Sequence, residues 1–527
     1  MGIPSYYKKL IDTVPGLKHG QHPGEIVEWL FMDFNCLIYH CLHREDTPPF
    51  PEDHNEHENW EAQFLDCIVR YCLKVIQEVQ PKKGVFIAVD GVVPMAKMRQ
   101  QRLRRFKSIW LRAQEDTVQA KWDTNAITPG TVFMKKLRIR LETMIQKAQK
   151  NREWILSSSD EPGEGEHKII AEWRSAPSKY TGNFAVYGLD ADLIVLTILG
   201  REVCGFNNKI WLFREEIVKG VIAYDEAGEE VFEWFSIHSL YDWLTADFSG
   251  VKSARQFILN YCFAMSVLGN DFLPSSLGLK IRDDGHGELL DIVRNLTVNN
   301  IPLIDPDTLR ISISLGALDA LFRLLSADEP ERICKYISKK QMMARNLVGD
   351  SDMKIGDNNW PLSHIDEEVL MGGHKSLAVN WKETYTHLLS NSVEKVCKEY
   401  LYGIQWIWAY YTGGAVCFNW FYPYSLPPLW EWLIGAKVPE YPGKILVRAT
   451  DIRTVEQLAL VLPLESWNLI PACPEKKLPY LAPQFYPERF SFETIGKRFF
   501  WECESMIPLP SILEVKRIIQ LASSSHT

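Results

Sequence analysis

The sequence predicts an α/β fold in which helices flank a mostly parallel central sheet and a mainly helical C-terminal segment packs on it. Three short apolar runs have the length and content of buried strands, and each stops at an aspartate: Glu28–Met32, Gly84–Val89 and Phe184–Leu189. Helical patterns lie between these runs, as in Trp60–Glu78, where apolar residues recur at helical spacing. Strands that alternate with helices form parallel sheets, which bind ligands at the carboxyl ends of the strands.

The length of 527 residues exceeds what one simple core organises. We predict an N-terminal α/β domain over residues 1–290 and a mainly helical part over residues 291–527. Within the second part, residues 296–340 and 381–411 have helical patterns. The polar, turn-rich stretch near residues 346–376 predicts a mobile loop.

Composition and charge limit the classes of protein that fit. Apolar residues make up 46% and aromatic residues 12% of the chain, which is typical of a packed globular protein and excludes a disordered one. The net charge of −9 means that a nucleic-acid site would have to be a local basic patch. The 11 cysteines show no C-x-x-C pair, which favours free thiols in a reducing compartment. No secretory leader or membrane span is predicted, so we expect a soluble, intracellular protein, in the cytoplasm rather than the nucleus.

Each of the three predicted strands runs into an aspartate, namely Asp33, Asp90 and Asp190. We expect these side chains to converge, because the carboxyl ends of parallel strands meet at one edge of a sheet. A single such aspartate is typical of a turn or helix cap, whereas three favour a metal site. The stretch Asp160–Lys168 adds four carboxylates around two glycines and a proline. Alone it would be a solvated acidic turn that opens a helix, but glycines between glutamates also suit close approach to a metal or phosphate.

Seven carboxylates form the candidate catalytic and metal-binding set: Asp33, Asp90, Glu164, Glu166, Asp190, Asp192 and Asp271. So many anions cannot share a pocket without compensation, because burial and mutual repulsion would protonate some of them. Hard divalent cations relieve this repulsion, and an all-oxygen ligand set indicates Mg²⁺ or Mn²⁺. Two ions about 3.5–4 Å apart would clamp a phosphodiester. The remaining two acidic residues of the stretch, Asp160 and Glu161, are interpreted as turn residues.

A basic helix is predicted after Pro94. One face of it carries side chains suited to a terminal phosphate: Lys97, Gln101, Arg104 and Arg105. The alternative is an exposed amphipathic face. Arg99, Arg102 and Lys107 point elsewhere and are interpreted as backbone-steering or solvated charges.

Together these motifs resemble the catalytic core of the XRN family of 5′→3′ exoribonucleases. The N-terminal motifs of the resemblance are Met1–Pro4, Met32–Asn35, Asp90–Arg105, Pro162–Lys168, Gly188–Ile194 and Leu268–Pro274. The downstream motifs are Gly403–Trp406, Tyr410–Tyr411, Asn419–Tyr424, Glu456–Pro463, Phe485–Arg489, Gly496–Glu502 and Met506–Pro508. They follow the family's order over nearly the whole chain.

The resemblance implies a PIN/flap-endonuclease-like nuclease domain and a role for each motif. The seven carboxylates match the family's metal-binding set, and the face of the basic helix matches its pocket for an RNA 5′-monophosphate. Tyr39 stands where the family has a histidine that packs on the first nucleotide, and Trp420 matches a tryptophan of a Trp-x-Trp run. Both are candidates for base stacking. Phe418 replaces the first tryptophan of that run, which leaves open which ring stacks, and Trp420 could instead be an ordinary core aromatic.

The function that the resemblance implies is metal-dependent, processive 5′→3′ degradation of single-stranded, 5′-monophosphorylated RNA to nucleoside 5′-monophosphates by two-metal hydrolysis. Decapping or adaptor proteins as partners are left open. One alternative is a flap-endonuclease-like DNA nuclease, but Asp271 is followed by Phe-Leu-Pro-Ser-Ser and not by a glycine-rich helix–turn–helix. A second alternative is a catalytically silent RNA-binding scaffold, which the full set of seven carboxylates disfavours. His167 is interpreted as a structural residue or a phosphate contact, because Mg²⁺ prefers oxygen ligands.

Overall fold

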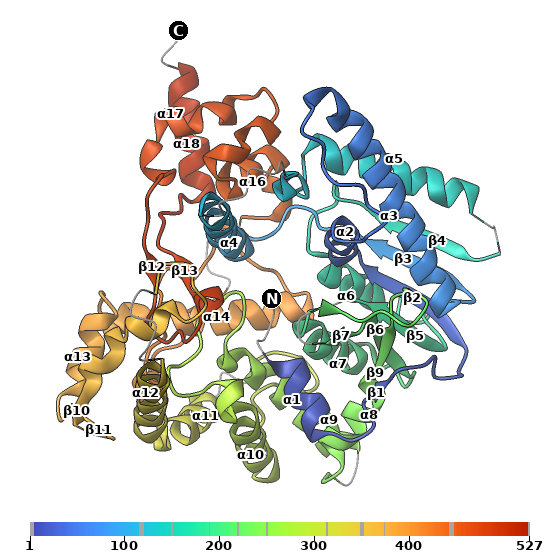
Figure 1. Cartoon of the computed structure of the whole chain (residues 1–527). Helices are drawn as coiled ribbons and strands as arrows, with labels where there is room; N and C mark the ends of the chain where they lie inside the picture. Colours follow the sequence, from blue (N-terminus) through green and yellow to red (C-terminus); the bar gives the residue numbers. More distant parts are fainter. Residues whose placement is uncertain are drawn as a thin grey trace.

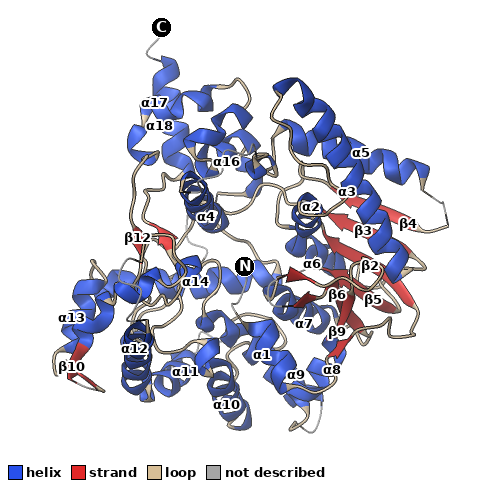
Figure 2. Ribbon diagram, viewed as in Figure 1, coloured by secondary structure: helices blue, strands red, loops and turns tan. Residues whose placement is uncertain are grey.

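A seven-stranded sheet organises the N-terminal half of the chain (Figure 2). The computed structural model describes residues 5–114, 121–148, 151–188, 190–218, 221–248, 251–311, 315–347, 353–373, 375–441 and 447–524, so the motif Met1–Pro4 lies outside the described residues. In spatial order the strands are β1 (Lys18–His19), β9 (Phe232–Ser236), β6 (Ile210–Glu215), β5 (Asn183–Tyr187), β2 (Val27–Asp33), β3 (Gly84–Ala88) and β4 (Glu153–Ser157). Strands β6, β5, β2, β3 and β4 are parallel, and β9 and β1 are antiparallel additions at one edge. The predicted fold class is confirmed.

The three predicted strands are the neighbours β5, β2 and β3 at the centre of this sheet. From β2 the chain adds β3 and β4 on one side, and it then returns to add β5 and β6 on the other side. Such a reversal of strand order leaves a crevice at the carboxyl ends of the strands, here between β2 and β5. Asp33 is the last residue of β2, and the turns after β3 and β5 lead to Asp90 and Asp190 at the same edge.

Alternating side chains of β2 supply two hydrophobic cores, one on each face of the sheet. Leu30 and Met32 pack with α2 (Asn35–Leu42), α3 (His57–Val79) and α5 (Val132–Lys147). Trp29 and Phe31 pack on the opposite side, in a larger core. The helices that cover this face of the sheet in the larger core include α6 (Gly165–Ser175), α7 (Asp192–Cys204), α8 (Ile237–Thr245) and α9 (Val251–Ala264). A strand that is apolar on both faces must be covered on both, and these helices do so.

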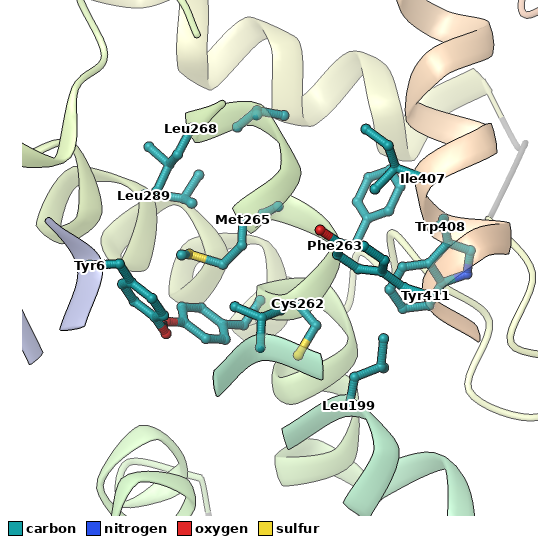
Figure 3. Packing of buried hydrophobic residues seen from close by; sticks show 14 of the residues in the cluster. Tyr6, Leu199, Cys262, Phe263, Met265, Leu268, Leu289, Ile407, Trp408 and Tyr411 are labelled. Atoms are coloured by element: carbon teal, nitrogen blue, oxygen red, sulfur yellow. Dashed lines mark hydrogen bonds between the residues drawn. The ribbon is translucent and has the colours of Figure 1, made fainter. Parts of the chain in front are cut away.

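The larger core continues from the helices on this face of the sheet into the C-terminal part (Figure 3). Tyr6 of α1 (Tyr6–Thr13) packs beside α9, and Phe263 of α9 contacts Trp408 with ring centroids 5.7 Å apart. Trp408 belongs to α14 (Val393–Thr412), which crosses from the C-terminal part toward α6 and α7 (Figure 1). The boundary at residues 290–291 therefore lies within one shared hydrophobic core, and the proposed division into two domains stays a prediction.

The C-terminal part is mainly helical, as expected. Its helices are α10 (Gly285–Val298), α11 (Leu315–Ala327), α12 (Glu329–Asn346), α13 (Trp381–Leu388), α14, α15 (Trp430–Leu433), α16 (Thr454–Val461), α17 (Leu478–Leu481) and α18 (Ile512–Ser524). The helical pattern over residues 381–411 forms two helices, because the chain breaks between α13 and α14. Ser390 adopts a left-handed conformation (φ 53°), and the Ser392 side chain caps α14 by accepting from the Lys395 N–H.

The stretch predicted as a loop, residues 346–376, has regular structure in its described part. It contains 3₁₀ turns at Trp360–Ser363 and Asp366–Leu370 and the hairpin β10 (Met371–Gly373)–β11 (Ser376–Leu377). Glu367 anchors it through a fully buried ion pair with Lys340 (2.9 Å). Its mobility stays a prediction. Two further short hairpins are β7 (Ile217–Val218)–β8 (Val221–Ile222) and β12 (Phe492–Glu493)–β13 (Glu504–Ser505). Within the described ranges, every helix is too short or too polar to span a bilayer.

Candidate metal and phosphate site

The seven candidate carboxylates lie at the carboxyl edge of the sheet. Asp33 ends β2, Glu164 directly precedes the first residue of α6, and Asp192 begins α7. Asp90 and Asp190 follow β3 and β5, Glu166 lies in the first turn of α6, and Asp271 follows the 3₁₀ turn Met265–Leu268. Sequence segments that are up to 238 residues apart thus supply one acidic cluster.

Mutual repulsion shows that these carboxylates are close together. Burial raises the pKa of Asp33 well above its ordinary value, and the charges of Asp90, Asp190 and Glu164 raise it further. The pKa of Glu166 is raised in the same way by burial, by Asp192 and by Glu164. Burial and the charges of Asp190 and Asp271 raise the pKa of Asp192 to about 7. Each carboxylate of the set therefore acts on at least one other, and the cluster favours a bound cation.

Lys97 supplies part of the compensating charge. Its Nζ lies 2.6 Å from Glu164 Oε2 and 2.7 Å from Asp271 Oδ2. Burial alone would lower the pKa of Lys97, but these two carboxylates raise it well above its ordinary value. Conversely, burial would raise the pKa of Asp271, but Lys97 outweighs it and the pKa is lowered. Lys97 therefore contacts the carboxylates themselves as well as belonging to the basic helix.

Two carboxylate oxygens of the cluster, Glu166 Oε2 and Asp192 Oδ1, are buried and have no hydrogen-bond partner in the described part of the chain. Glu164, Glu166 and His167 each present a ligand atom, and these atoms lie within 4.8 Å of one another. Hard oxygen donors that are buried and unpaired fit Mg²⁺ or Mn²⁺. The imidazole of His167 packs on the ring of Tyr410, with the two ring centroids 3.8 Å apart. Burial, followed by the charge of Lys97, lowers the pKa of this imidazole well below its ordinary value.

Close packing explains why position 165 of the acidic stretch is a glycine. A Cβ on Gly165 would lie 2.4 Å from Asp33 Oδ1 and 2.9 Å from the Ala88 carbonyl oxygen. The Gly165 N–H donates to Asp90 Oδ1 (2.7 Å), so the start of α6 rests directly on two of the strand-end carboxylates. Asp160 and Glu161 point elsewhere: Asp160 pairs with Arg138, and Glu161 accepts from the Ser157 hydroxyl. Their interpretation as turn residues agrees with these contacts.

Two further residues orient the cluster, and sequence reasoning assigned neither a role. Asn35 Nδ2 donates to Asp90 Oδ2 (3.0 Å), and its Oδ1 accepts from the Asp90 N–H (3.1 Å). Tyr410 on α14 donates its hydroxyl to Glu164 Oε1 (2.8 Å). The sequence signal that could have identified them is their place in the family motifs. Asn35 follows Asp33 by two residues, and Tyr410 belongs to a Tyr-Tyr pair.

The basic helix is α4 (Met95–Ala113). Gln101 Oε1 and Arg105 Nη1 are both buried, and neither meets a hydrogen-bond partner among the described residues. Burial lowers the pKa of Arg105 to about 10. Arg104 is exposed on the same helix. Buried donors and acceptors without partners are costly, so this face is suited to a polar ligand.

Arg102 and Lys107, interpreted as backbone-steering or solvated charges, are not solvated. Arg102 is fully buried and donates to the carbonyl oxygens of Leu460 (2.7 Å), Pro508 (3.1 Å) and Phe485. Lys107 donates to the Cys503 carbonyl (2.8 Å) in the same way. These cations attach the C-terminal segment to α4, because free carbonyls at its turns need donors.

The two stacking candidates lie in different surroundings. Tyr39 on α2 is half-buried and lies close enough to Arg105 to raise the pKa of that guanidinium against the effect of burial, which places Tyr39 beside the basic face. Trp420 is half-buried, donates its Nε1–H to Glu399 Oε2 (3.1 Å), and packs on Trp406 with ring centroids 5.2 Å apart. One face of Trp420 therefore contributes to the core. Base stacking by either ring, or by Phe418, stays a prediction.

The fold and this geometry define an α/β protein whose acidic site lies at the topological switch point of a parallel sheet, beside a buried basic helix. The chain belongs to the XRN family. Residues 1–216 match the description "XRN 5′-3′ exonuclease N-terminus", and residues 378–524 match "Xrn1 helical domain".

Similar proteins carry exoribonuclease names. The chain is 25% identical to 5′-3′ exoribonuclease 1 of Schizosaccharomyces pombe, over 99% of this chain and 48% of the relative. It is 27% identical to 5′-3′ exoribonuclease 1 of Homo sapiens, over 99% of this chain and 34% of the relative. It is 34% identical to 5′-3′ exoribonuclease 2 of Kluyveromyces lactis, over 70% of this chain and 43% of the relative. The chain thus spans half or less of the length of these relatives.

Proposed function

We propose that the chain is a metal-dependent, processive 5′→3′ exoribonuclease that degrades single-stranded, 5′-monophosphorylated RNA to nucleoside 5′-monophosphates. The observation that carries this proposal is the acidic cluster at the sheet edge, joined through Lys97 to a helix on which Gln101 Oε1 and Arg105 Nη1 are buried without a hydrogen-bond partner in the described part of the chain. Membership of the XRN family supports it.

The seven carboxylates would hold divalent cations, most directly through the unpaired oxygens of Glu166 and Asp192. A bound ion of this type polarises a phosphodiester and activates water for attack. The protein's own part is orientation. Asn35 and the Gly165 N–H fix both oxygens of Asp90, and Tyr410 fixes Glu164. Fixed ligands hold the reacting groups in place without reorganisation during the reaction.

The direction of degradation would follow from the basic face of α4. Arg105 and Arg104 would bind the terminal phosphate, and Gln101 would contribute its amide. Lys97 lies between this face and the carboxylates, so a nucleotide held by its 5′-phosphate would present its next phosphodiester to the acidic cluster. A pocket that fits one phosphate would exclude a cap or triphosphate.

The test is a time course of RNA decay by the purified chain. Single-stranded RNAs labelled at the 3′ end and carrying a 5′-monophosphate, 5′-triphosphate or 5′-hydroxyl, and a matched DNA, are compared over a titration of Mg²⁺. We expect Mg²⁺-dependent decay of the monophosphorylated RNA at least about tenfold faster than of the others. A 5′-labelled monophosphorylated RNA should release labelled mononucleotide. Asp190→Ala should abolish decay in a folded protein, and Asp242→Ala, which changes an exposed carboxylate on α8, should leave it unchanged.

Other outcomes would identify the alternatives. Preferential cleavage of DNA would support a flap-endonuclease-like nuclease. RNA binding without decay at any Mg²⁺ concentration would support a silent scaffold. Equal decay of monophosphorylated and hydroxyl RNA would contradict the role given to the basic face of α4.

A further inference from the structure

A cavity of about 570 Å³ lies along α4, where it is lined by Arg104 but by neither Gln101 nor Arg105. It begins beside Asp271 and Arg104, and it extends to the C-terminal segment around Lys497. Its far walls come from Lys280, Tyr336 and the residues near β13. Pockets that hold small ligands have volumes of about 300–1,000 Å³, so this one is large enough for a nucleotide.

The lining of the cavity has a net positive charge, because it contains seven Lys or Arg residues and four Asp or Glu residues. Lys280 Nζ donates to Ser275 Oγ (2.8 Å), and neither Lys280 nor Lys497 forms an ion pair with a carboxylate of the described chain. Burial, followed by the positive charge of Lys497, lowers the pKa of Lys280 to about 7. Glu502, a nearby carboxylate, opposes part of this shift and accepts a hydrogen bond from the backbone N–H of Arg498 (2.8 Å). Two partly desolvated cations that repel each other favour a bound anion.

The same cavity has unmet hydrogen-bonding capacity. Gln100, Tyr336 and Arg498 line it, and each has one buried polar atom (Gln100 Oε1, Tyr336 Oη and Arg498 Nε) without a partner among the residues that the structure describes. The set includes an acceptor, a hydroxyl and a charged donor, which together match the mixed polarity of a base and ribose. Tyr424 and Trp501 add aromatic surface to the walls. Aromatic surface accepts any base by stacking, whereas inorganic phosphate would leave it unused.

We propose that this cavity binds a nucleoside 5′-monophosphate. Lys280 and Lys497 would bind the phosphate, and the aromatic and unpartnered polar groups would bind the nucleoside. The source of the nucleotide rests on the proposed function: each cleavage beside Asp271 would release a nucleoside 5′-monophosphate at the mouth of the cavity, which would then be its way out. The binding itself does not depend on catalysis.

The test is a calorimetric titration of the intact chain with AMP, adenosine and inorganic phosphate, with divalent cations removed by EDTA. We expect saturable binding of AMP that is at least about tenfold tighter than binding of adenosine or phosphate. Lys497→Glu should weaken AMP binding at least about tenfold, because it reverses a charge in the cavity. Lys335→Glu makes the same charge change at an exposed site on α12 outside the cavity and should leave binding unchanged.

Tyr336→Phe provides a second, milder variant, which removes only the unpartnered hydroxyl and should weaken AMP binding a few-fold. Absence of AMP binding by the wild-type chain would overturn the proposal. So would equal binding by wild type and Lys497→Glu, or loss of binding in Arg105→Met alone, which would assign AMP to the basic face around Arg105. Because no RNA or metal is present, these results are separate from the RNA-decay test of the proposed function.

Discussion

Tyr410 donates its hydroxyl to Glu164 across 2.8 Å and thereby connects α14 to the start of α6. We expect Tyr410→Phe to raise the Mg²⁺ concentration needed for half-maximal RNA decay by about tenfold, because groups that orient metal ligands affect metal affinity to that extent. The free energy of unfolding should fall by only about 1 kcal/mol, since one hydrogen bond is lost. The measurement is the decay rate over a Mg²⁺ titration, together with urea unfolding.

Tyr400→Phe is the matched control on the same helix. Its hydroxyl is buried but meets no partner in the described chain, and it lies away from the carboxylates. It should leave the Mg²⁺ dependence unchanged. A Tyr410→Phe enzyme with wild-type Mg²⁺ dependence would show that Glu164 needs no orienting partner.

Gly165→Ala should disrupt the acidic cluster by sterics alone. The new Cβ would lie 2.4 Å from Asp33 Oδ1, so α6 or Asp33 must move, and the hydrogen bond from the Gly165 N–H to Asp90 would be strained. We expect RNA decay to fall at least about tenfold, with a loss of about 1–3 kcal/mol in the free energy of unfolding. Decay kinetics and urea unfolding measure both effects.

Gly316→Ala controls for the substitution itself. A Cβ there meets no atom within 4 Å, and the position lies in α11, so the unfolding free energy should be unchanged or rise slightly. If Gly165→Ala were as harmless as Gly316→Ala, the close approach of α6 to Asp33 would not be needed.

The sheet and the convergence of its strand-end carboxylates followed from local sequence, because each buried run was apolar and ended at an aspartate. Tyr410 could not be assigned from local pattern. It lies 246 residues from Glu164, on a helix so largely buried that no functional face stands out. The burial of Arg102 was not predicted, because a cation in a helix with many charged residues is usually solvated. The carbonyl groups that accept from Arg102 are more than 350 residues away in sequence. The end of α13 and the start of α14 could be predicted only from Ser392, because the sequence between these helices contains no glycine or proline.

Arg105 and Arg102 are both buried on α4 but should respond oppositely to replacement by methionine. Arg105 leaves Nη1 unpartnered among the described residues, so Arg105→Met should keep or raise the free energy of unfolding, by up to about 1 kcal/mol. The same change should reduce the preference for 5′-monophosphate over 5′-hydroxyl RNA at least about tenfold. Competition kinetics with the two RNAs and urea unfolding are the measurements.

Arg102→Met should instead lower the free energy of unfolding by about 3 kcal/mol or more, because three carbonyl oxygens lose their donor. In the fraction of the Arg102→Met protein that stays folded, the preference for 5′-monophosphate over 5′-hydroxyl RNA should change little. Destabilisation of both variants to the same extent would contradict the ligand-binding role of Arg105, since that arginine would then be needed for folding.

Glu329 makes the stability of the C-terminal part depend on pH. It is 3% exposed, accepts from the Trp430 N–H (2.9 Å), and has its pKa raised from 4.5 to about 8 by burial, although that hydrogen bond and Arg332 oppose the shift. Its contribution to stability is therefore fully present below pH 4.5 and is lost as the pH rises toward 8. In that interval the unfolded chain is ionised while the folded chain keeps its proton, which costs about 1.4 kcal/mol per pH unit.

Glu329→Gln should remove this dependence and keep an acceptor for Trp430. Between pH 6 and pH 8 the wild type should lose about 2 kcal/mol more unfolding free energy than the variant, as measured by urea unfolding at both pH values. Glu331→Gln, an exposed neighbour on α12, should follow the wild type. Parallel pH profiles for wild type and Glu329→Gln would mean that Glu329 is ionised in the folded chain, with Arg332 and the Trp430 N–H outweighing the cost of burying its charge.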